Sequence, residues 1–246
     1  MKVAILGGSG KTGRAVGAAL AQAGAATRPL GRAAFDDLPA ALAGADAVHV
    51  IAPNLHPDEP SYVAAVVDAA RATGVGRLGY HSVASPYAPA MPHHLGKAAS
   101  EDLVRRSGLA WTILQPCAYV QNLLPALRAA RTSGELTVPY AVDVPFGMVD
   151  LHDVAAATAV ALRGEEHVGA TYELGGPALV SVADVAAAVG LTARRVPAEP
   201  EAHPWLRAMF DYYDAHGLPT GGVPLRALLG RPPASVREVL ARDLGS

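Results

Sequence analysis

The chain contains little of several residue types that mark whole classes of proteins. Cys117 is its only cysteine, which excludes an intrachain disulfide and a metal site built from several thiolates. The formal net charge is −2, so charge gives no reason to expect a nucleic acid or a membrane surface as partner. No apolar run approaches the roughly 20 residues of a membrane span, and the short apolar run at the start does not resemble a signal peptide. These absences favour a cytoplasmic location.

The residues that are abundant indicate a folded globular chain. Of the 246 residues, 51% are apolar and 17% are charged, which differs from the composition of disordered segments. This length is sufficient for one large core together with a small additional lobe.

The most informative segment is KVAILGGSGKTGRAVG at residues 2–17. Lys2–Leu6 is a short apolar run with β-branched residues, which predicts a buried strand. Apolar residues then recur at helical spacing from Ala15 to Leu20, so the glycines lie at a strand-to-helix turn. Such a turn can hold the pyrophosphate of a dinucleotide, because the free amides at the helix start attract anions. The glycines of this turn are Gly7, Gly10 and Gly13.

The letters GSGKT at 8–12 also resemble the end of the phosphate-binding loop of ATPases. That motif requires a glycine five residues before Gly10, where this chain has Ile5. The apolar run at 47–52 ends in Pro53 rather than in an aspartate that would hold magnesium. We therefore prefer the dinucleotide-binding turn.

Strands and helices alternate along the first half of the chain, which predicts an α/β fold with a doubly wound parallel sheet. From about Gln121, short Pro- and Gly-rich segments interrupt the alternation, and we expect a small C-terminal substrate or cap lobe there. We expect a dinucleotide-binding core at 1–135, to which 149–175 returns, and a cap formed by 136–148 and 176–246. The expected strands are 2–6, 25–30, 45–52, 77–83 and 111–114, and the expected helices include 62–72, 97–106, 154–162, 182–189 and 204–215.

The end of the second expected strand bears on nucleotide preference. In dinucleotide-binding folds an acidic residue there binds the ribose 2′-hydroxyl of NADH, whereas an arginine accommodates the 2′-phosphate of NADPH. Arg28 and Arg32 flank this strand end, and the first acidic residues follow at Asp36 and Asp37. The arrangement favours NADP(H). The alternative interpretation is that both arginines are ordinary surface charges.

A second group of motifs follows in a recognisable order. The strand expected at 77–83 carries Ser82 at its end, and it is followed by a Pro-rich loop and by His93, four residues before Lys97. With these motifs the chain resembles the NmrA-like family of atypical short-chain dehydrogenase/reductases over nearly its whole length. The other motifs that carry the resemblance are GxxGxxG at 7–13, WTILQP at 111–116, LHDVAAA at 151–157, YELGGP at 172–177 and LLGRPPASVREVL at 228–240.

The resemblance implies a Rossmann fold and a set of catalytic residues. In typical short-chain dehydrogenases a tyrosine four residues before the lysine protonates a carbonyl, and this chain has His93 there. Histidine, with an unperturbed pKa of about 6.5, is a competent proton donor near neutrality. By this resemblance Lys97 binds ribose hydroxyls and Ser82 orients the substrate oxygen, with His81 or Tyr87 as alternative proton donors. The expected cofactor-binding residues are Gly7, Ser9, Gly10, Lys11, Thr12, Gly13, Arg28, Arg32, Ala52, Pro53, Lys97 and Pro116.

Each of these residues also has a structural interpretation. Lys97 would be an ordinary exposed lysine, Ser82 would satisfy a backbone group, and His93 would cap a helix. Asp153 is expected to cap the helix at 154–162, and no metal site is expected. The segment between Arg32 and Ala45 is shorter than in the family, which would leave the adenine side of the site open.

The C-terminal part of the chain offers candidate residues for a substrate pocket. An apolar stripe on the helix expected at 204–215 either packs in the core or lines such a pocket. A second apolar set precedes the motif at 151–157 and has the same two interpretations. These residues are Trp205, Leu206, Met209, Phe210 and Tyr213 in the stripe, and Pro145, Phe146 and Met148 in the second set.

The sequence favours an NADPH-dependent reductase of a small apolar carbonyl, quinone, imine or enone, acting as a monomer or a homodimer. The first alternative is an NAD(P)-sensing regulator that passes the state of the pool to a protein partner. The second is a non-redox reaction with a histidine base, because fold does not determine function.

Overall fold

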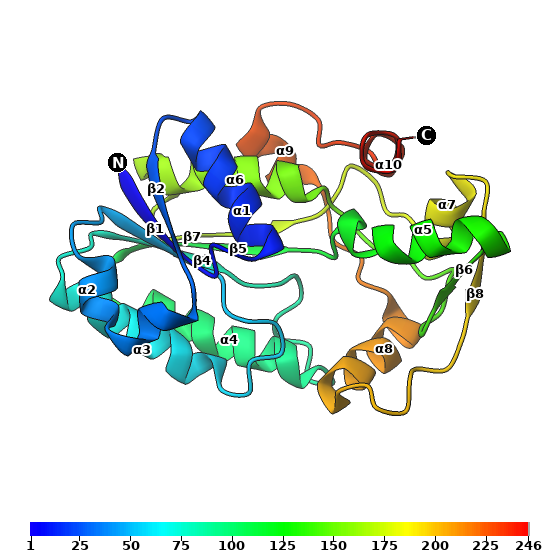
Figure 1. The fold of residues 1–246 in the computed structure, drawn as a ribbon, viewed down its shortest axis with the longest axis horizontal. Helices are drawn as coiled ribbons and strands as arrows, with labels where there is room; N and C mark the ends of the chain where they lie inside the picture. Colours follow the sequence, from blue (N-terminus) through cyan, green and yellow to red (C-terminus); the bar gives the residue numbers. More distant parts are fainter. Residues whose placement is uncertain (246) are drawn as a thin grey trace.

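Figure 1 shows the fold in a computed structural model, which describes residues 1–245. Six strands form one parallel sheet in the order β2-β1-β3-β4-β5-β7, and helices cover both of its faces (Figure 1). The predicted α/β fold with a Rossmann-type sheet is therefore confirmed. The strands are β1 (Lys2–Leu6), β2 (Ala26–Leu30), β3 (Ala47–Val50), β4 (Arg77–His81), β5 (Ala110–Pro116) and β7 (Ala170–Leu174).

The strand order reverses direction beside β1. This strand pairs with β2 on one side and with β3 on the other, and Leu30 and Val50 both lie opposite Leu6. The loops after these three parallel strands therefore leave the sheet at the same edge. In open α/β sheets such a reversal at the carboxyl ends of the strands is where ligands bind.

The alternation of side chains along β1 divides the core into two layers. Successive side chains of a strand point to opposite faces, so Val3 and Ile5 pack against α1 and α6 while Ala4 and Leu6 pack against α2 and α3. Helix α9 joins the first layer by packing on α6 and β7. The bounds are α1 (Lys11–Gln22), α6 (Leu151–Arg163) and α9 (Val223–Leu229) on one face, and α2 (Leu38–Leu42), α3 (Glu59–Ala72) and α4 (Pro92–Arg105) on the other.

A smaller lobe lies beyond the carboxyl edge of the large sheet (Figure 1). Its two strands, β6 (Glu135–Val138) and β8 (Thr192–Arg195), pair in parallel. The division of the chain into a core and a cap with the boundaries given above stays a prediction. The remaining elements are α5 (Leu124–Ser133), α7 (Val182–Ala187), α8 (Pro204–His216), α10 (Val236–Leu244) and the 3-10 helices η1 (Arg32–Asp36), η2 (Val120–Asn122) and η3 (Glu165–His167).

Helix α6 begins earlier than the sequence pattern indicated, and its cap is a different residue. Asp150 is the N-cap, and its carboxylate accepts a hydrogen bond from the amide of His152 at 3.2 Å. The prediction that Asp153 caps the helix is therefore wrong. Its side chain is buried and accepts hydrogen bonds from Arg231 and from the amide of Ala234, each at 2.6 Å. Asp153 is the third residue of α6, three positions after the N-cap, and its side chain fastens the C-terminal segment to this helix.

Among residues 1–245, no helix combines the length and the apolar composition needed to cross a membrane.

Candidate cofactor and substrate site

The turn between β1 and α1 is packed so closely that a Cβ would clash with backbone atoms at three of its positions, Gly7, Gly8 and Gly13. Gly7 has φ +75°, and a Cβ there would lie 2.4 Å from the carbonyl oxygen of Ile51. A Cβ at Gly13 would lie 2.2 Å from the carbonyl oxygen of Gly7. A Cβ at Gly10 would lie 3.3 Å from the carbonyl oxygen of Gly7, which is close but tolerable. The turn therefore depends on Gly7 and Gly13 for its shape and leaves the surface at Gly10 without a side chain.

The N-terminus of α1 at this turn is open for an anion. Gly10 is the N-cap residue and provides no side-chain cap, so the first amides of the helix keep their hydrogen-bonding capacity. These amides and the helix dipole together favour a negatively charged group. The residues present therefore fit a dinucleotide pyrophosphate.

A cavity of about 740 Å³ adjoins the turn, and we call it the glycine-turn pocket. Nine of the expected cofactor-binding residues line it, and none of its lining residues is a carboxylate. Phe35 and Tyr62 form an aromatic pair in its wall, with ring centroids 4.3 Å apart. The segment after Arg32, expected to leave this side open, folds as η1 and α2 and supplies Phe35. The pocket is lined by Gly7, Ser9, Gly10, Lys11, Thr12, Gly13, Gly31, Arg32, Phe35, Ile51, Ala52, Pro53, Asn54, His56 and Tyr62.

Arg28 does not reach the glycine-turn pocket, so its predicted role in the cofactor site is not supported. Its guanidinium donates a hydrogen bond to the carbonyl of Ala43 at 3.1 Å. The side chain lies in the middle of β2, two residues before the strand end, and is held beside a different depression of the surface. Arg32, which follows the strand, is the arginine that lines the pocket.

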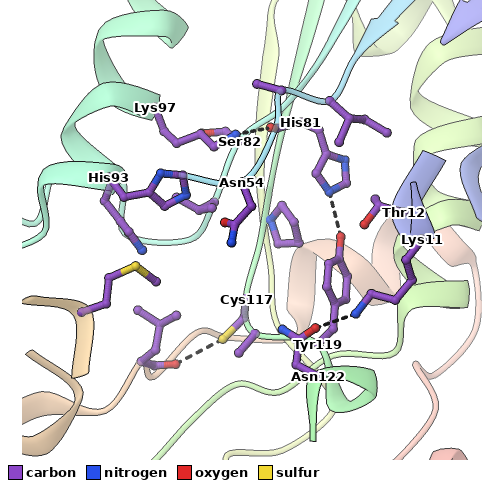
Figure 2. Close-up of a pocket in the computed structure, with 18 of the residues that line it drawn as sticks. Lys11, Thr12, Asn54, His81, Ser82, His93, Lys97, Cys117, Tyr119 and Asn122 are labelled. Carbon is purple, nitrogen blue, oxygen red and sulfur yellow. Dashed lines mark hydrogen bonds between the residues drawn. The ribbon is translucent and has the colours of Figure 1, made fainter. Parts of the chain in front are cut away.

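A second cavity of about 400 Å³ continues from the first, and we call it the reaction pocket. The two cavities share Lys11, Thr12, Ile51, Ala52 and Asn54. Figure 2 shows side chains from several distant parts of the chain around it. The lining includes Lys11, Thr12, Asn54, His81, Ser82, His93, His94, Lys97, Pro116, Cys117, Ala118, Tyr119, Asn122, Met209, Tyr213 and Leu218.

Lys97 lines the reaction pocket but is also part of a buried ion pair. Its Nζ lies 2.7 Å from Oε1 of Glu59 and donates to the carbonyl of His81 at 3.2 Å. The ammonium group also lies over the ring of Tyr80, 5.5 Å from the centroid. The interpretation of Lys97 as an ordinary exposed lysine is therefore wrong, and Glu59 is a partner that sequence reasoning missed.

Ser82 is occupied by a buried carboxylate. Its hydroxyl donates to Oε1 of Glu101 at 2.6 Å, and Gln115 donates to the same oxygen at 2.7 Å. Arg105 binds the other oxygen of Glu101 at 3.0 Å. The hydroxyl proton of Ser82 is therefore committed to Glu101, which leaves only its oxygen as an acceptor toward the pocket.

His93 lies in the first turn of α4, because Pro92 starts this helix five residues earlier than the pattern indicated. Burial, and then the positive charge of Lys97, lower the pKa of His93 to about 4. The imidazole is therefore neutral at pH 7. The prediction that His93 serves near neutrality as a protonated acid is not supported, although the ring lines the pocket. Burial also lowers the pKa of the neighbouring His94, whose Nδ1 lies 3.1 Å from the carbonyl of Ser85.

His81 and Tyr119 form a hydrogen-bonded pair on the side of the pocket next to the glycine turn (Figure 2). Nε2 of His81 lies 2.7 Å from the hydroxyl oxygen of Tyr119. Burial holds the pKa of His81 well below its ordinary range and raises the pKa of Tyr119. Lys11 lies over the Tyr119 ring at 5.8 Å and donates to Asn122 at 2.6 Å. Lys11 thus links the glycine turn to the segment that follows β5.

The far wall of the reaction pocket is apolar and comes largely from the smaller lobe. Met209 and Tyr213, from the stripe on α8, line it together with Leu218 and Cys117. Burial raises the pKa of the Cys117 thiol to about 11, so it remains protonated. The other members of the two predicted apolar sets do not line the pocket, and Phe146 packs instead on Tyr140 and Tyr213. Tyr87, an alternative proton donor in the sequence, is 64% exposed and does not line it either.

Sequence reasoning missed Tyr119 and Asn122 as pocket residues. Both follow the carboxyl end of β5, and Asn54 follows that of β3 in the same way. This position is a general indication of a ligand site in parallel sheets. Within residues 1–245, no group of three or more histidine, cysteine or acidic side chains is arranged to hold a metal ion.

Comparison with known families and structures agrees with this geometry. Residues 33–196 match the NmrA-like family. An NAD(P)H azoreductase of Xenophilus azovorans is 38% identical over 160 residues, which cover 64% of this chain and 55% of the azoreductase. The chain therefore spans little more than half the length of that relative.

Two further proteins extend the comparison. A (4-alkanoyl-5-oxo-2,5-dihydrofuran-3-yl)methyl phosphate reductase of Streptomyces griseus subsp. griseus is 30% identical over 197 residues, covering 73% of this chain and 69% of that one. The crystal structure of an NADPH-dependent quinone oxidoreductase from Escherichia coli, complexed with NADPH, superposes with a TM-score of 0.83. That match has 23% sequence identity and covers 99% of this chain and 100% of the other, so it supports the fold. The family match and the Streptomyces relative show what the sequence motifs indicated: this chain belongs to the NmrA-like family.

Proposed function

We propose that this chain is an NADPH-dependent oxidoreductase that reduces a small apolar acceptor, such as a quinone, carbonyl, imine or enone. The observation that carries the proposal is the continuity of two cavities across Lys11 and Thr12. One cavity has the uncapped helix start of a dinucleotide site, and the other has an apolar wall and a buried lysine. A ligand that occupies the first reaches directly into the second.

The glycine-turn pocket supports NADPH as the cofactor. Arg32 and Lys11 bring positive charge to it, and no carboxylate in its lining would repel a 2′-phosphate. Phe35 and Tyr62 offer aromatic surface for a planar base. When bound, NADPH supplies a hydride to the acceptor.

The reaction pocket supports a substrate that is mostly apolar. Cys117, Met209, Tyr213 and Leu218 exclude water from one side of the acceptor. Lys97 offers a fixed ammonium on the opposite side, where it binds ribose hydroxyls. The neutral imidazole of His93 donates a hydrogen bond to negative charge that develops on the acceptor, and the proton comes from water.

The names of similar proteins support the same class of reaction. The Xenophilus azovorans relative is an NAD(P)H azoreductase, and the Streptomyces relative is also named a reductase. The Escherichia coli structure contains NADPH in a protein with the same fold. A cytoplasmic location, and a monomer or homodimer as the assembly, stay predictions within this proposal.

The first experiment is calorimetric titration of the protein with NADPH and with NADH, followed by NADPH oxidation assays with quinones, azo dyes and enones. We expect NADPH to bind at least about tenfold more tightly than NADH and at least one acceptor to be reduced. If NADPH binds and no acceptor is reduced, the regulator alternative replaces the enzyme. If neither nucleotide binds, the proposal fails and the non-redox alternative remains.

A further inference from the structure

One ion pair in the described part of the chain has both partners buried, and it is the pair of Lys97 and Glu59. The two side chains are 7% and 2% exposed. In the pairs that hold Asp150 and Asp153, by contrast, the arginine partner is 42% or 54% exposed. A fully buried pair loses about as much free energy by dehydration as it gains by attraction. Stability alone therefore does not account for a buried charge pair at this place.

The start of α3 places Glu59. Asp58 caps this helix by accepting from the amide of Ser61 at 3.1 Å, and Glu59 is its first residue. Oε1 of Glu59 accepts from the Tyr80 hydroxyl at 2.6 Å and from Nζ of Lys97 at 2.7 Å. Oε2 is buried and has no hydrogen-bond partner among residues 1–245. The contacts of this carboxylate are thus concentrated on the oxygen that faces Lys97.

Lys97 keeps one donor free for a ligand. An ammonium group has three donors; one is directed to Glu59 and one to the carbonyl of His81. Within residues 1–245 no acceptor is found for the third, and Lys97 lines the reaction pocket whereas Glu59 does not. Glu59 can therefore influence a ligand in the pocket only through Lys97.

We infer that Glu59 is a positioning residue for the reaction: its carboxylate holds the Lys97 ammonium in place and directs the remaining N–H toward a hydroxyl or carbonyl oxygen of the ligand. This inference rests on the proposed function, in which that ligand is the ribose of NADPH. Without Glu59 the ammonium would lose its counter-ion in a buried site and keep only the carbonyl of His81 as an acceptor.

The other titratable groups around Lys97 do not replace this counter-ion. They are His81 and Tyr80 on β4 and His93, His94 and Glu101 on α4. The carboxylate of Glu101 is already bound by Ser82, Gln115 and Arg105. Burial lowers the pKa of all three histidines, and the charge of Lys97 lowers it further. Burial raises the pKa of Tyr80, so these four groups are neutral at pH 7 and Glu59 is the anion that pairs with Lys97.

The test is NADPH affinity of Glu59→Gln, measured by calorimetry at about pH 7. We expect this variant to bind NADPH about tenfold more weakly than wild type. Asp153→Asn is the matched control, since it also removes a buried carboxylate charge but lines neither pocket. It should lower thermal stability without a change in NADPH affinity.

A double-mutant cycle distinguishes a positioning role of Glu59 from a general structural role. Glu59→Gln should have no further effect on NADPH affinity in a Lys97→Met background, whereas a structural effect would be additive. If Glu59→Gln does not fold, the same cycle is measured with Glu59→Asp, which keeps the charge and withdraws it by one methylene. Equal NADPH affinities of Glu59→Gln and wild type, or additivity in the cycle, overturn the inference. Failure of wild type to bind NADPH overturns the proposed function instead.

Discussion

The glycine-turn pocket and the reaction pocket adjoin, yet the chain builds them in different ways. The first depends mainly on backbone shape over residues 7–13, where Gly7 and Gly13 leave no space for a Cβ. The second depends on side chains that come from α4, α8 and the ends of β4 and β5. Its lining runs from Lys11 to Leu218, which is most of the length of the chain.

The two pockets therefore depend on largely different sets of residues, one set for holding the nucleotide and the other for the reaction. Because glycines over residues 7–13 shape the turn, side chains of the reaction pocket can change without altering it. The reaction pocket is defined by contacts such as Lys97 with Glu59 and His81 with Tyr119, each of which joins two elements. Members of one family with the same fold can therefore differ in acceptor.

The largest effect on NADPH affinity is expected from Gly13→Val, which would distort the glycine-turn pocket. The new Cβ would meet Gly7 O at 2.2 Å and Gly8 Cα at 2.6 Å, so the turn must shift. We expect NADPH affinity, measured by calorimetry, to fall by about 100-fold or more. Gly17→Ala in the same helix is the control, because its Cβ meets only Ile5 at 3.4 Å. Unchanged affinity in Gly13→Val would contradict the assignment of the turn.

A second change tests the reaction pocket alone. Met209→Trp places a larger side chain in a cavity of about 400 Å³. We expect KM for the acceptor to rise by about tenfold while NADPH affinity is unchanged. Asp211→Trp, at an exposed position of α8, should change neither quantity. Steady-state kinetics and calorimetry measure the two effects, and a parallel loss of both would show that the pockets are not separable.

A third change tests which arginine selects the nucleotide. Arg32→Ala should reduce the preference for NADPH over NADH by about tenfold, because a charge-assisted contact to the 2′-phosphate is lost. Arg28→Ala should leave the preference unchanged, since this guanidinium binds the carbonyl of Ala43. Competitive titrations of the two nucleotides measure the ratio. A loss in Arg28→Ala equal to that in Arg32→Ala would restore the original prediction.

The smallest effect is a pH dependence of stability from His93. Its pKa is about 4 in the folded chain, below the ordinary value of 6.5. Between pH 4 and pH 6.5 the unfolded chain binds a proton at His93 that the folded chain does not. The free energy of unfolding that the neutral imidazole contributes is therefore fully present above pH 6.5 and is lost as the pH falls toward 4. The slope is about 1.4 kcal/mol per pH unit for one proton.

Urea unfolding between about pH 7 and about pH 4.5 measures this slope. His93→Gln should flatten it, while the exposed His216→Gln should not. Part of the slope should remain in His93→Gln, because burial lowers the pKa of His49 to about 3. An unchanged slope in His93→Gln would place the His93 imidazole in contact with water.

The sequence by itself determined the parallel sheet and the cofactor turn, because both depend on local patterns. The run Lys2–Leu6 and the glycines after it indicate a strand, a turn and a helix from local pattern alone. Family motifs added Lys97 and His93 as members of one pocket, and the structure places both there.

Only the tertiary structure decided what surrounds those side chains. Glu59 lies 38 positions from Lys97, and Tyr119 lies 38 positions from His81, so no periodicity relates them. Burial then changed their chemistry: it made His93 neutral at pH 7 and enclosed the charge of Lys97 with that of Glu59. Proton affinity and ion pairing depend on the local dielectric and on neighbours brought together by folding, and residue order alone does not contain either quantity.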